Sequence, residues 1–253
     1  MKLTLDRRTA QEIADMLVAN TPFVVEGYVP RGTSTLISGE GESGKSLITE
    51  HLAMAVANGF DWMGHAVDKG PVIILDRENT AEFDLKPRLP ALRAGFEAEG
   101  HEISLENIII PELPERFALN DLDSILALSE LCESVKPTLV IVDSLGDFIT
   151  GGDSNSADSM FTVFNNVNSL MRKHNCAALV IHHLRKRGDG SNGNNSAGQR
   201  VRGSGAIRDT VRSNIAVSKT KSGLITIEHE KSNRGQTMDR LTVQLVATDV
   251  NRH

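Results

Sequence analysis

Short apolar runs alternate with amphipathic segments along most of the chain. The runs predict buried strands at 33–38, 71–76, 107–110, 138–143 and 177–182. The segments between them have helical periodicity and predict helices at 45–58, 80–99, 120–135 and 157–174. Pro87 and Pro90 are expected to break or kink the second of these helices. Apolar strands that alternate with helices predict an α/β fold, with a mostly parallel sheet flanked by helices on both faces.

The two ends of the chain have different patterns. Residues 9–19 predict an amphipathic helix with Thr9 as its N-cap, and a connector spaced by proline and glycine follows it. Near the other end, turn residues separate three apolar runs, at 213–219, 224–230 and 240–247. We expect these runs to add antiparallel strands at one edge of the sheet. The domain organisation predicted is an N-terminal helix and connector over 1–30 and one α/β domain over 31–253.

Composition places the chain among ordinary globular proteins. Hydrophobic residues make up 40% and charged residues 24%, while aromatics are only 4%, so aliphatic side chains must build the core. Cys132 and Cys176 have no partner at a zinc-site spacing and are too few for a disulfide framework. The first residues lack the apolar stretch of a secretory signal, and no apolar run approaches the ~18 residues of a membrane span. We expect a soluble, cytoplasmic protein with no membrane partner.

Charge is unevenly distributed. The net charge is -6, yet the segment 185–212 holds seven basic and two acidic residues and so carries +5. The remainder of the chain therefore carries -11. Bulk composition alone argues against a nucleic-acid partner, but this segment would attract phosphate. Its middle, 188–198, is rich in glycine, asparagine and serine, which predicts a loop.

The strand at 33–38 leads into GEGESGKS and then into a helix. The pattern G-x-x-x-x-G-K-S in a strand–loop–helix context predicts a nucleotide-binding phosphate loop. Its glycines let the backbone wrap a phosphate chain, and the helix N-terminus adds partial positive charge. Lys45 can reach the β- and γ-phosphates of ATP, and the Ser46 hydroxyl can hold Mg²⁺. The predicted nucleotide contacts are Gly39, Glu40, Gly41, Glu42, Ser43, Gly44, Lys45, Ser46 and Leu47.

Two carboxylates follow other predicted strands. Asp143 ends TLVIVD, at the strand tip where open parallel sheets bind ligands, and is expected to hold Mg²⁺ together with Ser46. Glu78 lies just past PVIILD and is the candidate that orients or deprotonates the attacking water. The alternatives are that Asp143 caps a turn and that Glu78 is a first-turn acid of the next helix.

The strand at 177–182 ends in two histidines. His182 or His183 could contact the γ-phosphate and relay its presence to the loop that follows. Zinc binding is the alternative, but no cysteine or HExxH-type partner lies nearby. A pair of surface histidines is the remaining interpretation.

Taken together, GEGESGKS, LDRENT, TLVIVDS, HHLRK, RGSGAIRDTVR and KSNRG resemble the RecA-like core of hexameric replicative helicases. The resemblance is strongest to the RepA type of plasmids and mobile elements and covers about residues 20–247. It implies a RecA-like P-loop NTPase domain. It also implies that Glu78 is the catalytic base, that Asp143 is the metal-side acid and that His183 is the γ-phosphate sensor.

The same resemblance implies an oligomer. Arg212 is similar to the family's arginine finger, which reaches ATP bound by the neighbouring subunit, and Lys231 is similar to a second cation that acts across the interface. Arg202 and Arg208 compete with Arg212 for the first role. A finger supplied by a neighbour requires a homo-oligomer, which in this family is a hexamer.

Two loops would meet DNA in such a ring, one at 150–158 and one at 185–202. The first has no basic residue. The predicted DNA contacts are in the second: Arg185, Lys186, Arg187, Arg200 and Arg202. Neither loop contains an aromatic residue, so binding to single-stranded DNA should be led by the phosphate backbone and should depend on salt. The alternative is a surface loop whose charges are merely solvated.

The resulting hypothesis is an ATP hydrolase that acts as a ring-forming helicase or translocase on single-stranded DNA. A RecA-like regulatory ATPase without unwinding activity is the nearest alternative. A P-loop kinase with the arginine-rich tract as its lid leaves Glu78 and the histidine pair without a role. A non-hydrolysing DNA-binding scaffold would not need Lys45, Asp143 and Glu78 together.

Overall fold

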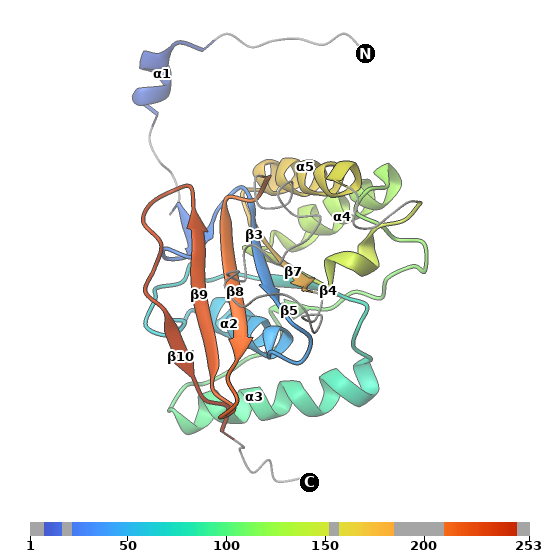
Figure 1. The fold of residues 1–253 in the computed structure, drawn as a ribbon. Helices are drawn as coiled ribbons and strands as arrows, with labels where there is room; N and C mark the ends of the chain where they lie inside the picture. The colour runs from blue at the N-terminus through green and yellow to red at the C-terminus, as the bar shows by residue number, and fades with distance from the viewer. Residues whose placement is uncertain (1–7, 17–21, 152–156, 185–209, 247–253) are drawn as a thin grey trace, which may run out of the picture.

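An eight-stranded sheet forms the centre of the molecule, with helices on both faces (Figure 1). The computed structural model describes residues 8–16, 22–151, 157–184 and 210–246. The strand order is β10-β9-β8-β3-β7-β6-β4-β5. The strands are β3 (Ser34–Gly39), β4 (Val72–Asp76), β5 (Ile108–Ile109), β6 (Leu139–Asp143), β7 (Ala177–His183), β8 (Ser213–Lys219), β9 (Ile225–Ser232) and β10 (Leu241–Val243).

Most of the sheet is parallel. β3 pairs in parallel with β7 and β8, β6 pairs in parallel with β7 and β4, and β4 pairs in parallel with β5. The antiparallel pairs are β8 with β9 and β9 with β10. The predicted parallel sheet with an antiparallel extension formed by the last three strands is therefore confirmed.

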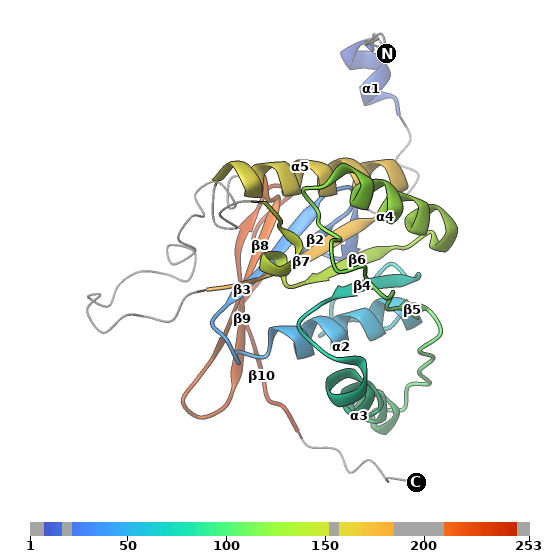
Figure 2. The same ribbon diagram turned by 90° about the vertical axis from the view of Figure 1, so that its right-hand side faces the viewer.

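Side chains of the central strands alternate between two cores. On β6, Leu139 and Ile141 belong to one core cluster, whereas Val140 and Val142 belong to the other. Helices α2 (Lys45–Asn58) and α3 (Lys86–Ala98) lie on the first face, and α4 (Leu122–Val135) and α5 (Ala157–His174) lie on the second (Figure 2). Because both faces are covered, β4, β6 and β7 are apolar on both faces until their last residues, which is why the sequence shows them as continuous apolar runs.

The N-terminal segment differs from its prediction. Helix α1 spans only Ala10–Ala14, with the Thr9 side chain accepting a hydrogen bond from the Glu12 N–H (3.1 Å), and none of its residues is buried. The helix predicted over 9–19 therefore ends earlier in the described part of the chain, because no packing extends it. Positions 17–19 of the prediction lie outside the described residues.

The connector contains two strands that the sequence analysis missed. β1 (Phe23–Val25) and β2 (Val29–Pro30) form an antiparallel ribbon. Its Val24 and Tyr28 are completely buried, and the Tyr28 ring stands edge-on to Trp62 with 5.5 Å between centroids. The sequence analysis missed the strands because four turn-forming residues (Pro22, Gly27, Pro30 and Gly32) lie within eleven residues, and their turn signals outweigh the short apolar runs. The core thus includes residues that precede position 31.

The predicted helix at 80–99 is divided in the structure. A turn of π-helix, η1 (Ala81–Leu85), leads directly into α3 at Lys86. Pro87 occupies the first turn of α3, where its missing N–H has no intrahelical partner, and Pro90 lies inside the helix. The last strand is shorter than the predicted 240–247, because β10 covers only Leu241–Val243.

One side chain connects α5 to the start of the strand that leads to the phosphate loop. Asn168 is buried, and its Oδ1 accepts hydrogen bonds from Ser34 N (2.8 Å), Ser34 Oγ (2.9 Å) and Thr33 Oγ1 (3.1 Å). Removing this acceptor would leave several buried donors without a partner.

We therefore expect Asn168→Ala to lower the free energy of unfolding by about 1–3 kcal/mol. Urea denaturation measures it. Asn165→Ala is the matched control, since Asn165 is an exposed asparagine on the same helix, and it should change stability by no more than about 0.5 kcal/mol. Equal stability losses in the two variants would contradict the prediction.

Candidate active site

The loop Gly39–Ser46 connects β3 to α2, as the sequence pattern predicts. Gly44 has φ = 92°, a left-handed conformation that favours glycine. Gly39 has a different constraint, because a Cβ there would collide with the Val217 carbonyl oxygen and the Ser43 hydroxyl. Gly41 has open space around it. Two of the three glycines are therefore required by the local structure of the loop.

Lys45 points back into this loop. The residue is 3% exposed, and Nζ donates to the carbonyl oxygens of Gly39 (3.1 Å) and Glu40 (2.8 Å). Burial lowers the pKa of Lys45, while the nearby Asp143 and Glu78 carboxylates oppose that shift. The loop thus holds a buried cation at the position where the phosphates of a nucleotide would enter.

Asp143 lies at the C-terminal end of β6 and is 3% exposed. Burial raises the pKa of Asp143 to about 6, and a hydrogen bond with the Ser46 side chain opposes the shift. Oδ1 has no hydrogen-bond partner among the described residues. A buried carboxylate oxygen without a partner, beside a serine hydroxyl, suits a hard cation that prefers oxygen ligands, so the two residues fit Mg²⁺.

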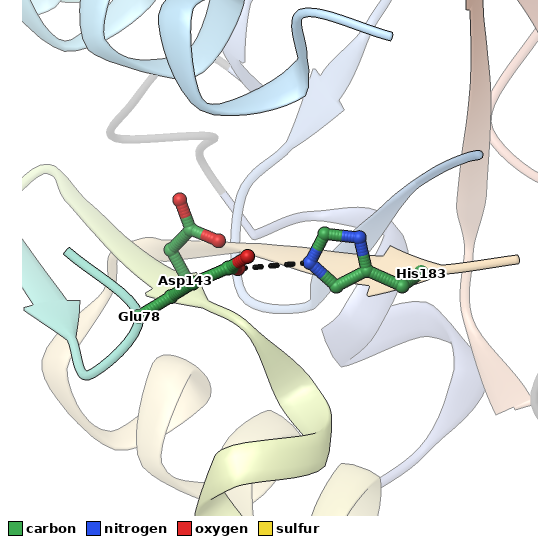
Figure 3. Close-up of side chains that lie close together, drawn as sticks. All are labelled: Glu78, Asp143 and His183. Atoms are coloured by element: carbon green, nitrogen blue, oxygen red, sulfur yellow. Dashed lines mark hydrogen bonds and ion pairs between the residues drawn. The ribbon is translucent and has the colours of Figure 1, made fainter. Parts of the chain in front are cut away.

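Glu78 is held near the site by the turn that follows β4. The Asp76 Oδ1 accepts hydrogen bonds from the backbone N–H of Glu78 (3.0 Å) and of Asn79 (2.9 Å). The Glu78 side chain reaches toward β7, where its Oε2 lies 2.9 Å from His183 Nε2 (Figure 3). The carboxylate is about half exposed and therefore accessible to water.

Strand register brings these residues together. Asp76 on β4 lies opposite Asp143 on β6, and Gly39 on β3 lies opposite His183 on β7. One donor atom each from Glu78, Asp143 and His183 lies within 4.8 Å of the others (Figure 3). The structure therefore assembles Lys45, Ser46, Glu78, Asp143 and His183 at one edge of the sheet, although their catalytic roles stay predictions.

The two histidines differ in their surroundings. His183 contacts Glu78, whereas burial lowers the pKa of His182 to about 4. His182 is therefore neutral at physiological pH, and its strand neighbour is Ser38 on β3. The residue pattern alone left the two histidines open, because a strand turns successive side chains to opposite faces and the pattern does not show which face contains the site. Only the resemblance favoured His183.

Arg212 is not part of this assembly. It precedes β8, and its backbone N–H lies 3.4 Å from the Ser34 carbonyl oxygen, at the start of β3. Gly39 is five residues further along β3, or roughly 16 Å at the usual rise of a strand. The exposed Arg212 lines a cavity of about 400 Å³ with Thr33 and Asn168. Lys231 on β9 is paired with Asn214 near this same end.

The predicted DNA contacts (Arg185, Lys186, Arg187, Arg200 and Arg202) lie outside the described residues, as do the competing Arg208 and most of the loop 150–158. The structure therefore does not test them. Among the helices it does describe, none is long and apolar enough to cross a membrane.

The sequence analysis missed a second buried carboxylate beside the site. Glu50 lies on α2, one turn after Ser46, and is 4% exposed. Burial raises the pKa of Glu50 to about 7, and the Asp76 and Asp143 carboxylates add to the shift, while Arg88 opposes it. The only sequence signal was a charged residue at the position i+4 from Ser46, which is common on an exposed helix face.

A cavity of about 390 Å³ adjoins the first turns of α2. Leu47, Ile48 and His51 line it from α2, and Phe96 lines it from α3. The His51 and Phe96 rings are stacked with 4.4 Å between centroids. The cavity therefore has an aromatic wall, and its lining includes Leu47, the residue that directly follows Ser46.

The ionised form of Asp143 is disfavoured by the fold. An unfolded aspartate has a pKa of about 3.9, so the folded protein binds the extra proton between about pH 4 and pH 6. The stability contributed by this group therefore falls as pH rises through that window. In the absence of metal and nucleotide, Asp143→Asn should raise the free energy of unfolding at pH 8 by up to about 3 kcal/mol.

The gain should be much smaller at pH 4, close to the unfolded pKa, and urea denaturation at both pH values measures it. Asp61→Asn, at an exposed position, is the control and should show no such dependence on pH. A loss of stability of equal size at the two pH values would contradict the prediction.

Comparison with known proteins agrees with this geometry. A family model described as an AAA domain matches residues 11–189, which include the phosphate loop, Glu78, Asp143 and both histidines. A search of curated proteins finds no match. The sheet, with its mostly parallel centre, flanking helices and antiparallel C-terminal strands, is the α/β fold of P-loop NTPases. The chain belongs to the AAA domain family of P-loop ATPases.

Proposed function

We propose that the protein is an ATP-driven motor that assembles into a ring and moves along single-stranded DNA. The RepA-type helicases that it resembles form hexamers, and we propose the same ring size here. The observation that carries the proposal is the separation of two sets of residues. Lys45, Glu78 and Asp143 lie at the C-terminal ends of the parallel strands, whereas Arg212 lies near the start of β3, at their N-terminal ends. An arginine in that place cannot reach its own phosphate loop, but it is exposed and available to a neighbouring subunit.

ATP hydrolysis follows from the charges at the first edge. Lys45 and the loop amides would bind the phosphates, and Ser46 and Asp143 would hold Mg²⁺. When bound there, Mg²⁺ offsets negative charge on the phosphates. Glu78 is exposed enough to meet a water molecule, and its carboxylate would take the proton as the water attacks the γ-phosphate.

The contact between Glu78 and His183 supports a link between nucleotide binding and catalysis. Without nucleotide, His183 Nε2 lies 2.9 Å from the Glu78 carboxylate. A γ-phosphate bound in the loop would offer His183 a more highly charged acceptor. His183 would then leave Glu78, and the carboxylate would be free to bind the attacking water.

The DNA-related part of the proposal is based on charge and on the resemblance. The segment 185–212 carries +5 in a chain of net charge -6; it begins two residues after His183 and ends at Arg212. DNA bound by this segment would therefore be connected directly to the γ-phosphate sensor on one side and to the proposed finger on the other. A RecA-like regulatory ATPase would share the nucleotide site but would not respond to DNA.

The first test is the steady-state ATPase rate with and without single-stranded DNA. We expect the rate to rise with DNA, because the basic segment that would bind DNA directly follows the strand that ends in His183. Glu78→Gln should lower the rate by about 10²-fold or more, since an amide cannot accept the proton.

Replacing Arg185, Lys186 and Arg187 by alanine should weaken DNA binding and flatten its salt dependence.

A rate that is indifferent to DNA across salt concentrations would favour the regulatory ATPase. Hydrolysis that is unaffected by Glu78→Gln would remove Glu78 as the base. Unchanged DNA binding in the triple variant would show that DNA contacts another surface.

The second test addresses the neighbouring subunit. Arg212→Ala should retain nucleotide binding but lose about 10³-fold or more in turnover, because the finger stabilises charge in the transition state. Mixing Arg212→Ala with Glu78→Ala should restore part of the activity, since some junctions would then combine an intact finger with an intact base. Lack of rescue in a mixture shown by mass measurement to co-assemble would refute the assignment of Arg212.

A further inference from the structure

The turn that carries Glu78 is built on one aspartate side chain. Asp76 Oδ1 accepts the backbone N–H groups of Glu78 and Asn79, and Oδ2 accepts Asn79 Nδ2 at 2.9 Å. The Asp76 carboxylate therefore fixes the backbone from which the Glu78 side chain extends. Burial raises the pKa of Asp76, but these three hydrogen bonds and Arg88 oppose the shift.

A second set of contacts connects this turn to the phosphate-loop helix. Arg88, on α3, donates from Nη2 to Asn79 Oδ1 (2.9 Å) and from Nη1 to Glu50 Oε1 (2.7 Å). The Glu50 side chain is 5% exposed and extends from α2. A single guanidinium thus bridges the Glu78 turn and the helix that begins with Lys45 and Ser46.

The two hydrogen bonds of Arg88 can fix the position of the Glu78 turn relative to α2. The guanidinium is planar and rigid, so its two donor groups hold Asn79 and Glu50 at a defined separation. The Glu50 carboxylate is buried, and its Oε2 has no hydrogen-bond partner among the described residues. Among the described residues Arg88 is the ion-pair partner of this carboxyl group, so separating α2 from α3 there would leave a buried polar group without its partner.

We propose that Arg88 is a positioning residue, which through Asn79 and Asp76 holds the Glu78 carboxylate at a fixed place relative to the phosphates bound by α2. On this proposal it acts through its hydrogen bonds to Asn79 and Glu50, not on the reacting groups. The inference rests on the proposed role of Glu78 as catalytic base. The inference adds that Glu78, which follows β4, and the phosphate loop, which follows β3, must keep a fixed position relative to each other for catalysis.

Asn79→Ala is the primary variant, because it cuts the link beside the turn and leaves the ion pair between Arg88 and Glu50 intact. Arg88→Gln is the second, and Arg93→Ala is the matched control. Arg93 lies on the same helix and is paired with a glutamate (Glu97, 2.6 Å), but on the exposed surface. The measurements are kcat and KM for ATP, the Kd of a fluorescent ATP analogue and the melting temperature.

We expect Asn79→Ala to lower kcat by about 10- to 100-fold, because small misplacements of a reacting group have effects of this size. The Kd of the nucleotide analogue should change by less than about 2-fold, since Lys45 and the loop are intact. Arg93→Ala should match the wild type in both. The Asn79→Ala/Arg88→Gln double variant should be no slower than the slower single variant, because both residues act on one path.

Different results would separate this inference from the proposed function. If Asn79→Ala keeps wild-type kcat while Glu78→Gln is inactive, the positioning role is refuted and the ATPase assignment stands. A lower melting temperature with weaker analogue binding and unchanged kcat would make the bridge purely structural, which also refutes it. If Glu78→Gln keeps the wild-type rate, both the inference and the assignment of the base fail.

Discussion

The parallel register of four central strands is the constraint on which the rest of this structure depends. In parallel strands, the carboxyl ends of neighbours meet at the same edge, so residues distant in sequence become adjacent without further design. Gly39, Asp76, Asp143 and His183 each lie at such an end, and they are paired across β3, β4, β6 and β7. The phosphate loop, the base-bearing turn and the histidine therefore depend on one shared ladder of backbone hydrogen bonds.

The second property of the site is an excess of buried negative charge. Asp143 and Glu50 both have raised pKa values, while Lys45 and Arg88 supply the nearby positive charge. Such a site is costly to the free protein and gains most when a divalent cation binds. Each of the two cations has a separate task, since Lys45 faces the loop and Arg88 faces the Glu78 turn. On the proposed function, Mg²⁺ held by Ser46 and Asp143 would offset part of this repulsion among carboxylates.

On the proposed function, residues at the two ends of the parallel strands would serve different subunits. The C-terminal ends of the parallel strands hold the groups proposed to bind and cleave ATP. Near the N-terminal ends lie Arg212, beside the Asn168 that anchors the start of β3, and Lys231, which pairs with Asn214. A strand is rigid along its length, so β3 would connect the nucleotide of one subunit to the finger that acts on the next. On the proposed function, this is how hydrolysis at one junction could be communicated around a ring.

Sequence alone determined the strand order along the chain, the phosphate loop and the acids at the strand ends. It could do so because continuous apolar runs have few alternatives to buried strands, and because glycine, aspartate and lysine at these positions carry their own geometry. It failed for β1 and β2, where proline and glycine dominate a short window, and for the end of α1, which lacks packing. Tertiary structure alone decided that His183 rather than His182 meets Glu78, that Arg88 bridges α2 and the Glu78 turn, and that Arg212 lies away from its own loop. These facts depend on strand register and helix placement, which arise from contacts between residues far apart in the chain.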